Sequence, residues 1–169
     1  MASFAVPSAR AVGISAIYAG FIATIGGTLA LVCRVLAGVM ADVLHFRLLR
    51  VAGSMLIVGS IGYLLLSIDT KYLFIVGIFV AFSVGSGWNA LFLLALARDF
   101  PGNSGKATGI GLSGAYVGGV VGPLIFGFVL ARFGFSTAWI TEAVVACLAG
   151  VGAVSAGRIL RRIAETTTS

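Results

Sequence analysis

The sequence predicts an all-α integral membrane protein with five transmembrane helices. Of its 169 residues, 60% are hydrophobic and only 9% are charged, and the mean hydropathy is +1.15, well outside the usual composition of soluble domains. Five apolar stretches are each long enough to cross a hydrocarbon core of about 30 Å as a helix. They form a single membrane domain over residues 1–169, with predicted spans at 12–33, 49–68, 72–97, 107–131 and 135–157.

The first two stretches are expected to form an antiparallel hairpin. Arg34 is the only charge between residues 11 and 41, so the first helix has room to tilt or to project on the cytoplasmic side. The second stretch follows Arg50 and ends at 69–71, where Asp-Thr-Lys leaves room only for a tight external turn. The leading residues MASFAVPS are interpreted as external loop sequence that has acquired a start codon.

The other three stretches carry small residues within apolar surroundings. The third contains Gly-Ser-Gly-Trp-Asn at 85–89, and the fourth contains GAYVGGVVGPLIFG at 114–127. In the fifth, Trp139 suits the outer membrane interface, and the acid Glu142 follows about one turn deeper. The basic, amphipathic end GRILRRIAE is expected to lie on an anionic leaflet.

Positive charge is concentrated in the connections at one end of the predicted bundle. The segments 42–50, 98–106 and 158–169 hold Arg47, Arg50, Arg98, Lys106, Arg158, Arg161 and Arg162. The opposite connections hold only Arg10, Lys71 and Arg132. By the positive-inside rule, this asymmetry predicts a multi-pass protein of the cell membrane with its N-terminus outside and its C-terminus in the cytoplasm. The net charge of +6 therefore reflects topology, and no nucleic-acid partner is expected.

Several other classes of protein are excluded. A secreted protein would become polar after its signal peptide, and this chain never does. There is no nucleophile motif and no phosphate-binding loop, so we expect neither an enzyme nor a cofactor. Cys33 and Cys147 lie in predicted spans without CxxC or histidine spacing and are interpreted as small apolar packing residues. No disulfide framework and no metal site are expected.

The fourth stretch carries glycines at intervals of four residues, namely Gly114, Gly118 and Gly122, with Gly127 in rough continuation. Membrane helices associate through close van der Waals contact, which such small residues allow. Pro123 removes a backbone donor and favours a bend in the helix. The pattern fits a bent helix that rolls against a neighbour, and it fits equally well ordinary tight packing without a moving part.

This glycine-rich, Gly-Pro-containing stretch resembles a helix found in each half of major facilitator superfamily transporters. The segment RVLAGVMADVLHFR at 34–47 is similar to the cytoplasmic loop signature of that family. The matching positions are Arg34, Gly38, Asp42 and Arg47. The departures, which are more typical of the second copy of this loop, are Val43, His45 and Phe46. The resemblance implies that the chain corresponds to spans eight to twelve, in the C-terminal half of a twelve-span transporter. Residues 87–127 are also similar to cyanate-permease-like members, which handle small anions or organic acids.

The resemblance further implies roles for individual residues. Asp42 would act as a latch by pairing with a neighbouring helix end and a loop cation, which holds one conformation of the transport cycle. The alternative is interfacial anchoring, with Arg34 snorkelling to the membrane surface. His45, in the same loop, is interpreted as an interface residue rather than a proton site.

Two further positions are candidates from the residues alone. Trp88 and Asn89 lie at mid-span, where they either line a cavity or pack against other helices. Glu142 is the only carboxylate within a predicted span, and intramembrane acids are functional candidates, here for proton coupling. Its shallow predicted depth favours hydration at the interface instead.

The resulting hypothesis is transmembrane transport of a small solute, with small anions as candidates, by a fragment of a secondary transporter. Its partners would be the lipid bilayer and a missing N-terminal half that supplies the other wall of the cavity. Met1 would then be an internal start, and the chain alone would not transport. The alternative is a small non-transporting membrane protein that assembles through its glycine-rich helix face.

Overall fold

The computed structural model describes residues 2–43, 48–100 and 102–167, and the side chains of residues 3–41, 48–100 and 102–160. These residues are almost entirely helical and include no strand, which confirms the all-α prediction. The elements are α1 (Ala2–Ala11), α2 (Ala16–Val43), α3 (Leu48–Leu66), α4 (Lys71–Phe79), the π-helical turn η1 (Val80–Val84), α5 (Gly85–Asp99) and α6 (Ser104–Thr167).

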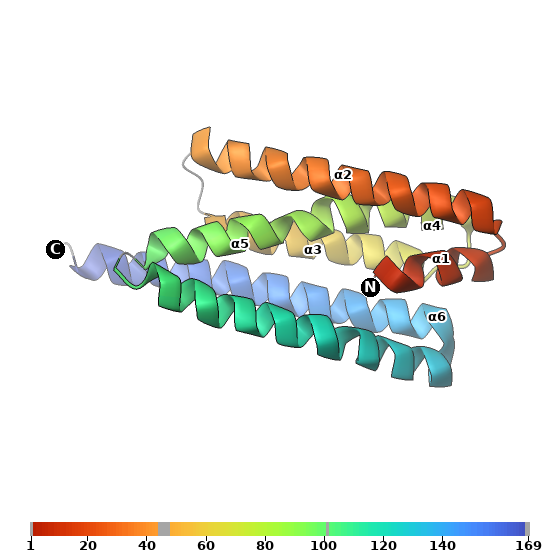
Figure 1. Cartoon of the computed structure of the whole chain (residues 1–169). Helices are drawn as coiled ribbons and strands as arrows, with labels where there is room; N and C mark the ends of the chain where they lie inside the picture. The colour runs from red at the N-terminus through yellow and green to blue at the C-terminus, as the bar shows by residue number, and fades with distance from the viewer. Residues whose placement is uncertain (1, 44–47, 101, 168–169) are drawn as a thin grey trace.

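The long helices form an elongated bundle in which successive rods run in opposite directions (Figure 1). The C-terminal ends of α2 and α5 and the N-terminal ends of α3 and α6 lie at one end of the bundle, together with the last described turns of α6. The α1–α2 and α3–α4 connections lie at the other end. This is the grouping of connections that the charge pattern predicted.

Helix α6 consists of two antiparallel arms. The backbone leaves the helical conformation at Gly134, with φ 81° and ψ 177°, and the chain reverses there (Figure 1). A straight helix of 64 residues would be about 96 Å long, roughly three times the hydrocarbon thickness. By length and apolar composition, four of the described helical segments are able to span a membrane, the last covering Ser104–Leu160. Five spans follow if its arms count separately, and that number stays a prediction.

Residues 2–11 are helical, so their interpretation as an external loop is wrong. Within α1, Ala5, Ser8 and Ala9 are buried, and packing on this face outweighs the weak helix propensity of a segment that contains Pro7. A turn through Gly13, with φ 84°, separates α1 from α2. The first membrane helix therefore begins at Ala16, four residues later than predicted, and continues to Val43.

Helix α3 is the central rod, because it contacts α4, η1, α5 and α6. Glycines bring these backbones unusually close. A Cβ placed on Gly59 would lie 2.6 Å from Gly85 Cα, and one on Gly62 would lie 2.5 Å from Ala81 N. On the side of α6, a Cβ on Gly53 would lie 2.7 Å from the carbonyl oxygen of Gly150. Small residues on α3 therefore determine how tightly the bundle packs.

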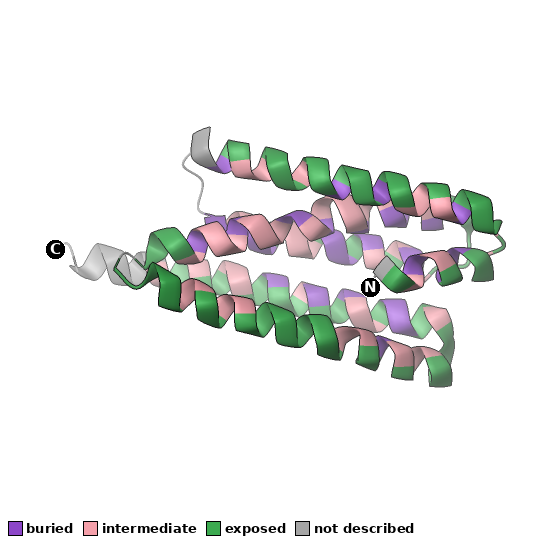
Figure 2. Cartoon of the chain, viewed as in Figure 1, coloured by how far each residue is buried: buried purple, intermediate pink, exposed green. Residues whose placement is uncertain are grey.

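An aromatic cluster fills the end of the bundle beside α1. Trp139 is fully buried, with 0% of its surface exposed, and its ring lies edge-on to Phe126 at 4.8 Å between centroids and parallel to Tyr63 at 6.0 Å. Its indole Nε1 donates a hydrogen bond of 2.8 Å to Ser8 Oγ. Trp139 therefore packs inside one end of the bundle, and its depth in the membrane stays a prediction. Exposed hydrophobic side chains are concentrated on α2 and on the first arm of α6 (Figure 2).

Candidate functional site

Arg34 joins α2 to the rod formed by α4, η1 and α5. Its Nε donates a hydrogen bond of 3.2 Å to the backbone carbonyl oxygen of Ser86. Ser86 is the second residue after η1, and its hydroxyl donates to the carbonyl of Phe82, as Ser83 does to Phe79. Single π-helical turns of this kind are often found at functional sites because they disturb the regular backbone ladder. The contact therefore lies where the third apolar rod is least regular.

The guanidinium of Arg34 is directed away from the C-terminal end of α2. Side chains on a helix lean towards its N-terminus, and the N-terminus of α2 lies at the opposite end of the bundle (Figure 1). Ser86, to which Arg34 binds, is close to the midpoint of the segment Lys71–Asp99. Interfacial snorkelling of Arg34, the alternative considered above, would place this contact near the membrane surface, and it stays a prediction.

A cavity of about 400 Å³ lies beside this contact. It is lined by Ala23, Gly27, Ala30, Arg34, Tyr63, Ala81, Phe82 and Ser86. Arg34 is the only charged residue in this lining, and Tyr63 adds a phenol hydroxyl. The cavity thus combines one cation with mostly apolar walls, which is the usual composition of a small-molecule site.

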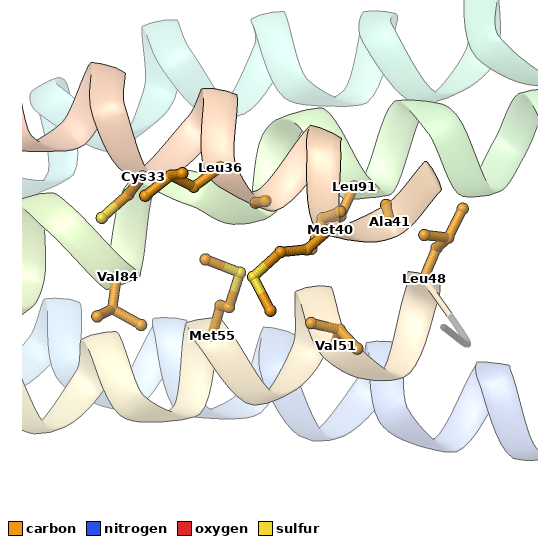
Figure 3. Close-up of a pocket in the computed structure, with 10 residues that line it drawn as sticks. Cys33, Leu36, Met40, Ala41, Leu48, Val51, Met55, Val84 and Leu91 are labelled. Carbon is orange, nitrogen blue, oxygen red and sulfur yellow. The ribbon is translucent and has the colours of Figure 1, made fainter. Parts of the chain in front are cut away.

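A second cavity of about 290 Å³ lies nearer the α2–α3 connection and offers no charge. It is lined by Cys33, Leu36, Ala37, Met40, Ala41, Leu48, Val51, Met55, Val84 and Leu91. Met40 and Met55 approach each other across it from α2 and α3 (Figure 3). Flexible methionines of this kind fill irregular apolar gaps, so we interpret this space as loosely packed core. Cys33 and Cys147 are both free and half-buried.

The predicted cytoplasmic loop motif is described only in part. Gly38 is half-buried, and a Cβ placed on it would meet no atom within 4 Å. The side chain of Asp42, together with His45 and Arg47, lies outside the described residues. At the end of α2, Arg98 Nη1 donates a long hydrogen bond of 3.5 Å to the carbonyl oxygen of Ala41. A cation from α5 thus lies at the C-terminal end of α2, where the helix dipole favours positive charge.

Trp88 and Asn89 are half-buried on α5, and neither lines the two cavities above. Trp88 packs edge-on against Phe92 and against the apolar cluster around Leu91. The neighbouring glycines, expected to leave room for a ligand, contact α3 instead: Gly85 faces Gly59, and a Cβ placed on Gly87 would lie 2.4 Å from Met55 Cε. These contacts favour the packing role over the cavity role.

The first two glycines of the stripe in the fourth stretch do not pack against another described helix of this chain. Gly114 and Gly118 are exposed, and a Cβ on either would meet no atom within 4 Å. Gly122 and Pro123 are half-buried, and a Cβ placed on Gly127 would lie 3.9 Å from Cζ of the Phe4 ring. The close helix contacts of the bundle are made by other glycines, on α3, and sequence spacing does not distinguish the two sets.

Glu142 is half-buried on the second arm of α6. It lies eight residues after Gly134, about 12 Å along the helix from the chain reversal. Hydration at the interface and proton coupling both stay predictions for this residue. Sequence reasoning missed Tyr63, Ser86 and Gly27 as cavity residues, because a lone tyrosine, serine or glycine within an apolar span gives no distinctive signal.

The apolar bundle and its cavity with one charged residue are those of a polytopic membrane protein with space for a small solute. The chain belongs to the Major Facilitator Superfamily, whose family model matches residues 1–167. Members of this family carry small solutes across membranes and are not enzymes, so membership assigns the chain to multi-pass membrane transport proteins. Neither the curated proteins nor the solved structures that were searched gave a match.

Proposed function

We propose that the chain is the C-terminal half of a secondary transporter of the cell membrane and moves a small solute together with an N-terminal half. The observation that carries this proposal is the cavity beside Arg34, because it contains a charge at the depth where the two halves of such transporters bind their substrate. The similarity of residues 87–127 to cyanate-permease-like members supports small anions or organic acids as the solute class.

In this proposal the bundle has five spans, which correspond to spans eight to twelve. The two arms of α6, at 104–133 and 135–167, count as the last two. The end that holds the α2–α3 and α5–α6 connections faces the cytoplasm, because the basic residues Arg50, Arg98, Lys106 and Arg158 gather there. The outer end holds the turns at 12–15 and 67–70.

The N-terminal half would cover apolar surface that this chain leaves exposed. The first arm of α6 presents Gly114 and Gly118 without a neighbour, and a smooth glycine face allows a second helix to approach closely. A bend at Pro123 would let the contact roll during transport. Asp42 would hold one conformation as a cytoplasmic latch, and Glu142 is the candidate for proton coupling.

Reconstitution into proteoliposomes tests this proposal. The purified chain alone is expected to give no saturable uptake of radiolabelled cyanate, acetate or benzoate above that of empty liposomes. Restored uptake on co-reconstitution with a separately encoded N-terminal half would support the proposal. Robust, saturable uptake by the chain alone would overturn the incompleteness, and no uptake in either preparation would overturn the transport assignment for these solutes.

The bare glycine face also fits the second candidate function, assembly of a non-transporting membrane protein with itself or with another subunit. A cysteine introduced as Gly118→Cys, in a background lacking Cys33 and Cys147, distinguishes the two by oxidative crosslinking in membranes. A regular homo-oligomer favours the assembly function. Crosslinking to an N-terminal half favours the split transporter.

A further inference from the structure

We propose that the apolar cavity between α2 and α3 holds an acyl chain of an anionic phospholipid, whose headgroup lies beside Arg98. This inference goes beyond the proposed function, because it concerns a lipid of the surrounding bilayer and not a transported solute. Four observations carry it: the apolar lining, the exposed rim, the position of the cavity at one end of two membrane-spanning segments, and the cation at that end.

The lining of the cavity suits a hydrocarbon chain better than water. It encloses about 290 Å³, none of its described residues is charged, and the Cys33 thiol is their only polar side chain. Buried water needs several polar partners, whereas apolar cavities stay dry and bind apolar molecules. The lining follows α2 from Cys33 to Ala41, which is eight residues or about 12 Å along the helix. The cavity is therefore elongated along the direction of the spans.

The cavity has a closed floor and an exposed rim. In the described residues, α2 packs on α5 and η1 but not closely on α3. The floor includes Leu91, which is 2% exposed, whereas Leu36 and Met40 on the α2 side are 53% and 50% exposed. Met40 and Met55 extend into the space between the two helices (Figure 3), and such flexible side chains can rearrange around a guest. In a bilayer, acyl chains are the apolar molecules that meet this rim.

One end of the cavity coincides with the ends of two membrane-spanning segments. Ala41 and Leu48 line the cavity, and they are the last and first residues of segments that are long and apolar enough to cross a membrane. Lipid headgroups are therefore expected at this level. Arg98, which is exposed near the end of α5, donates a hydrogen bond of 3.5 Å to the carbonyl oxygen of Ala41. A cation thus lies at the end of the cavity where a headgroup would be.

The charge at this end of the bundle favours an anionic headgroup. The described side chains here include four cations and one acid, namely Arg50, Arg98, Lys106, Arg158 and Asp99. Cations near a membrane surface attract anionic lipids. Arg50 lies against α6, because a Cβ placed on Gly157 would be 3.2 Å from its Cγ, whereas Arg98 binds a residue of the lining. A guanidinium has five N–H donors, so Arg98 can keep its contacts within the chain and also donate to a phosphate.

Photolabelling of the full chain in phosphatidylcholine nanodiscs tests the proposal. The probes are phosphatidylglycerol and phosphatidylcholine with the same diazirine-bearing acyl chain, and mass spectrometry locates the labelled residues. Phosphatidylglycerol should label Leu36, Met40 and Val51 more than Val35 and Val39, which are exposed on α2 but do not line the cavity. The phosphatidylcholine probe should label the lining about fivefold less, as expected for the effect of one cation near the surface.

Matched variants separate the headgroup from the acyl chain. Arg98→Gln is expected to reduce labelling of the lining by phosphatidylglycerol to the level of phosphatidylcholine, whereas Lys106→Gln, which removes an exposed cation at the same end, should retain the preference. Ala37→Leu adds a side chain to the lining and should remove its label from both probes. Ala115→Leu, on the exposed surface of α6, should not. Circular dichroism identifies any variant that fails to fold, and Val51→Phe then fills the cavity from α3.

Labelling of the lining no stronger than at Val35 and Val39, equal labelling by the two probes, or a preference that survives Arg98→Gln would each overturn the proposal. A lining without label would also overturn it, because a second copy of the chain or an N-terminal half would then cover the cavity. These outcomes are distinct from failure of the proposed transport function, since labelling is measured without a solute and without flux.

Discussion

Gly59 on α3 and Gly85 on α5 meet backbone to backbone. A Cβ placed on Gly59 would lie 2.6 Å from Gly85 Cα, and one on Gly85 would lie 3.1 Å from Gly59 Cα. Real Cβ atoms do not approach other atoms at the first of these distances. The two helices are therefore in contact only because both positions lack a side chain, and this contact fixes η1 and Ser86 relative to α3.

We predict that Gly59→Ala destabilises the bundle by about 1–2 kcal/mol, because the cost of overpacking exceeds the gain in helix propensity. The free energy of unfolding in mixed micelles titrated with sodium dodecyl sulfate, followed by circular dichroism, measures the effect. Gly118→Ala is the matched control: its methyl group meets no atom within 4 Å, so it should be neutral or stabilise by up to about 1 kcal/mol. Equal effects at the two positions would contradict the packing described.

We predict an energetic coupling between Trp139 and Ser8. Trp139→Phe removes the indole donor and leaves the buried Ser8 hydroxyl without its partner, at a cost of about 1–3 kcal/mol. In a double-mutant cycle with Ser8→Ala, the coupling should be about 1 kcal/mol. Trp88→Phe, which preserves an edge contact with Phe92, should cost less. A coupling indistinguishable from zero would mean that α1 does not dock as described.

The sequence alone predicts the helical rods well, because a bilayer demands apolar stretches of a definite length and leaves charges for the connections. It fails at α1, where ten residues with an internal Pro7 give no periodic signal and packing around Ser8 decides the conformation. It also does not reveal the partner of Trp139, because the buried hydroxyl that binds the indole belongs to a residue 131 positions away.

The candidate site is less predictable than the fold. Arg34 stands out because a charge in an apolar span is rare, yet its partner Ser86 and the cavity beside it depend on which faces of α2 and α5 meet. The glycines illustrate the same limit. The regular stripe at Gly114 and Gly118 is conspicuous in the sequence, whereas the contacts at Gly59 and Gly62 are irregularly spaced and acquire meaning only once α3 is known to be central.

We predict that Gly134→Ala destabilises the chain reversal in α6 by about 1–3 kcal/mol. The φ of 81° and ψ of 177° at this position fall in a region of backbone space that is essentially restricted to glycine. Gly152→Ala, within the second arm and with no atom within 4 Å of the added methyl, is the control and should not destabilise. The same micelle titration compares the two variants. A neutral Gly134→Ala would indicate a different backbone at the turn.

Finally, we predict the orientation of the bundle in the cell membrane from the side on which single cysteines react. In a background lacking Cys33 and Cys147, Asp69→Cys lies in the α3–α4 connection and Asn103→Cys lies between α5 and α6, at opposite ends of the bundle (Figure 1). Because the basic residues gather at the end that holds Asn103, this end should face the cytoplasm. A membrane-impermeant maleimide should therefore label Asp69→Cys in intact cells and label Asn103→Cys only after permeabilisation. Labelling of Asn103→Cys in intact cells, with Asp69→Cys protected, would reverse the orientation and place the α2–α3 connection outside.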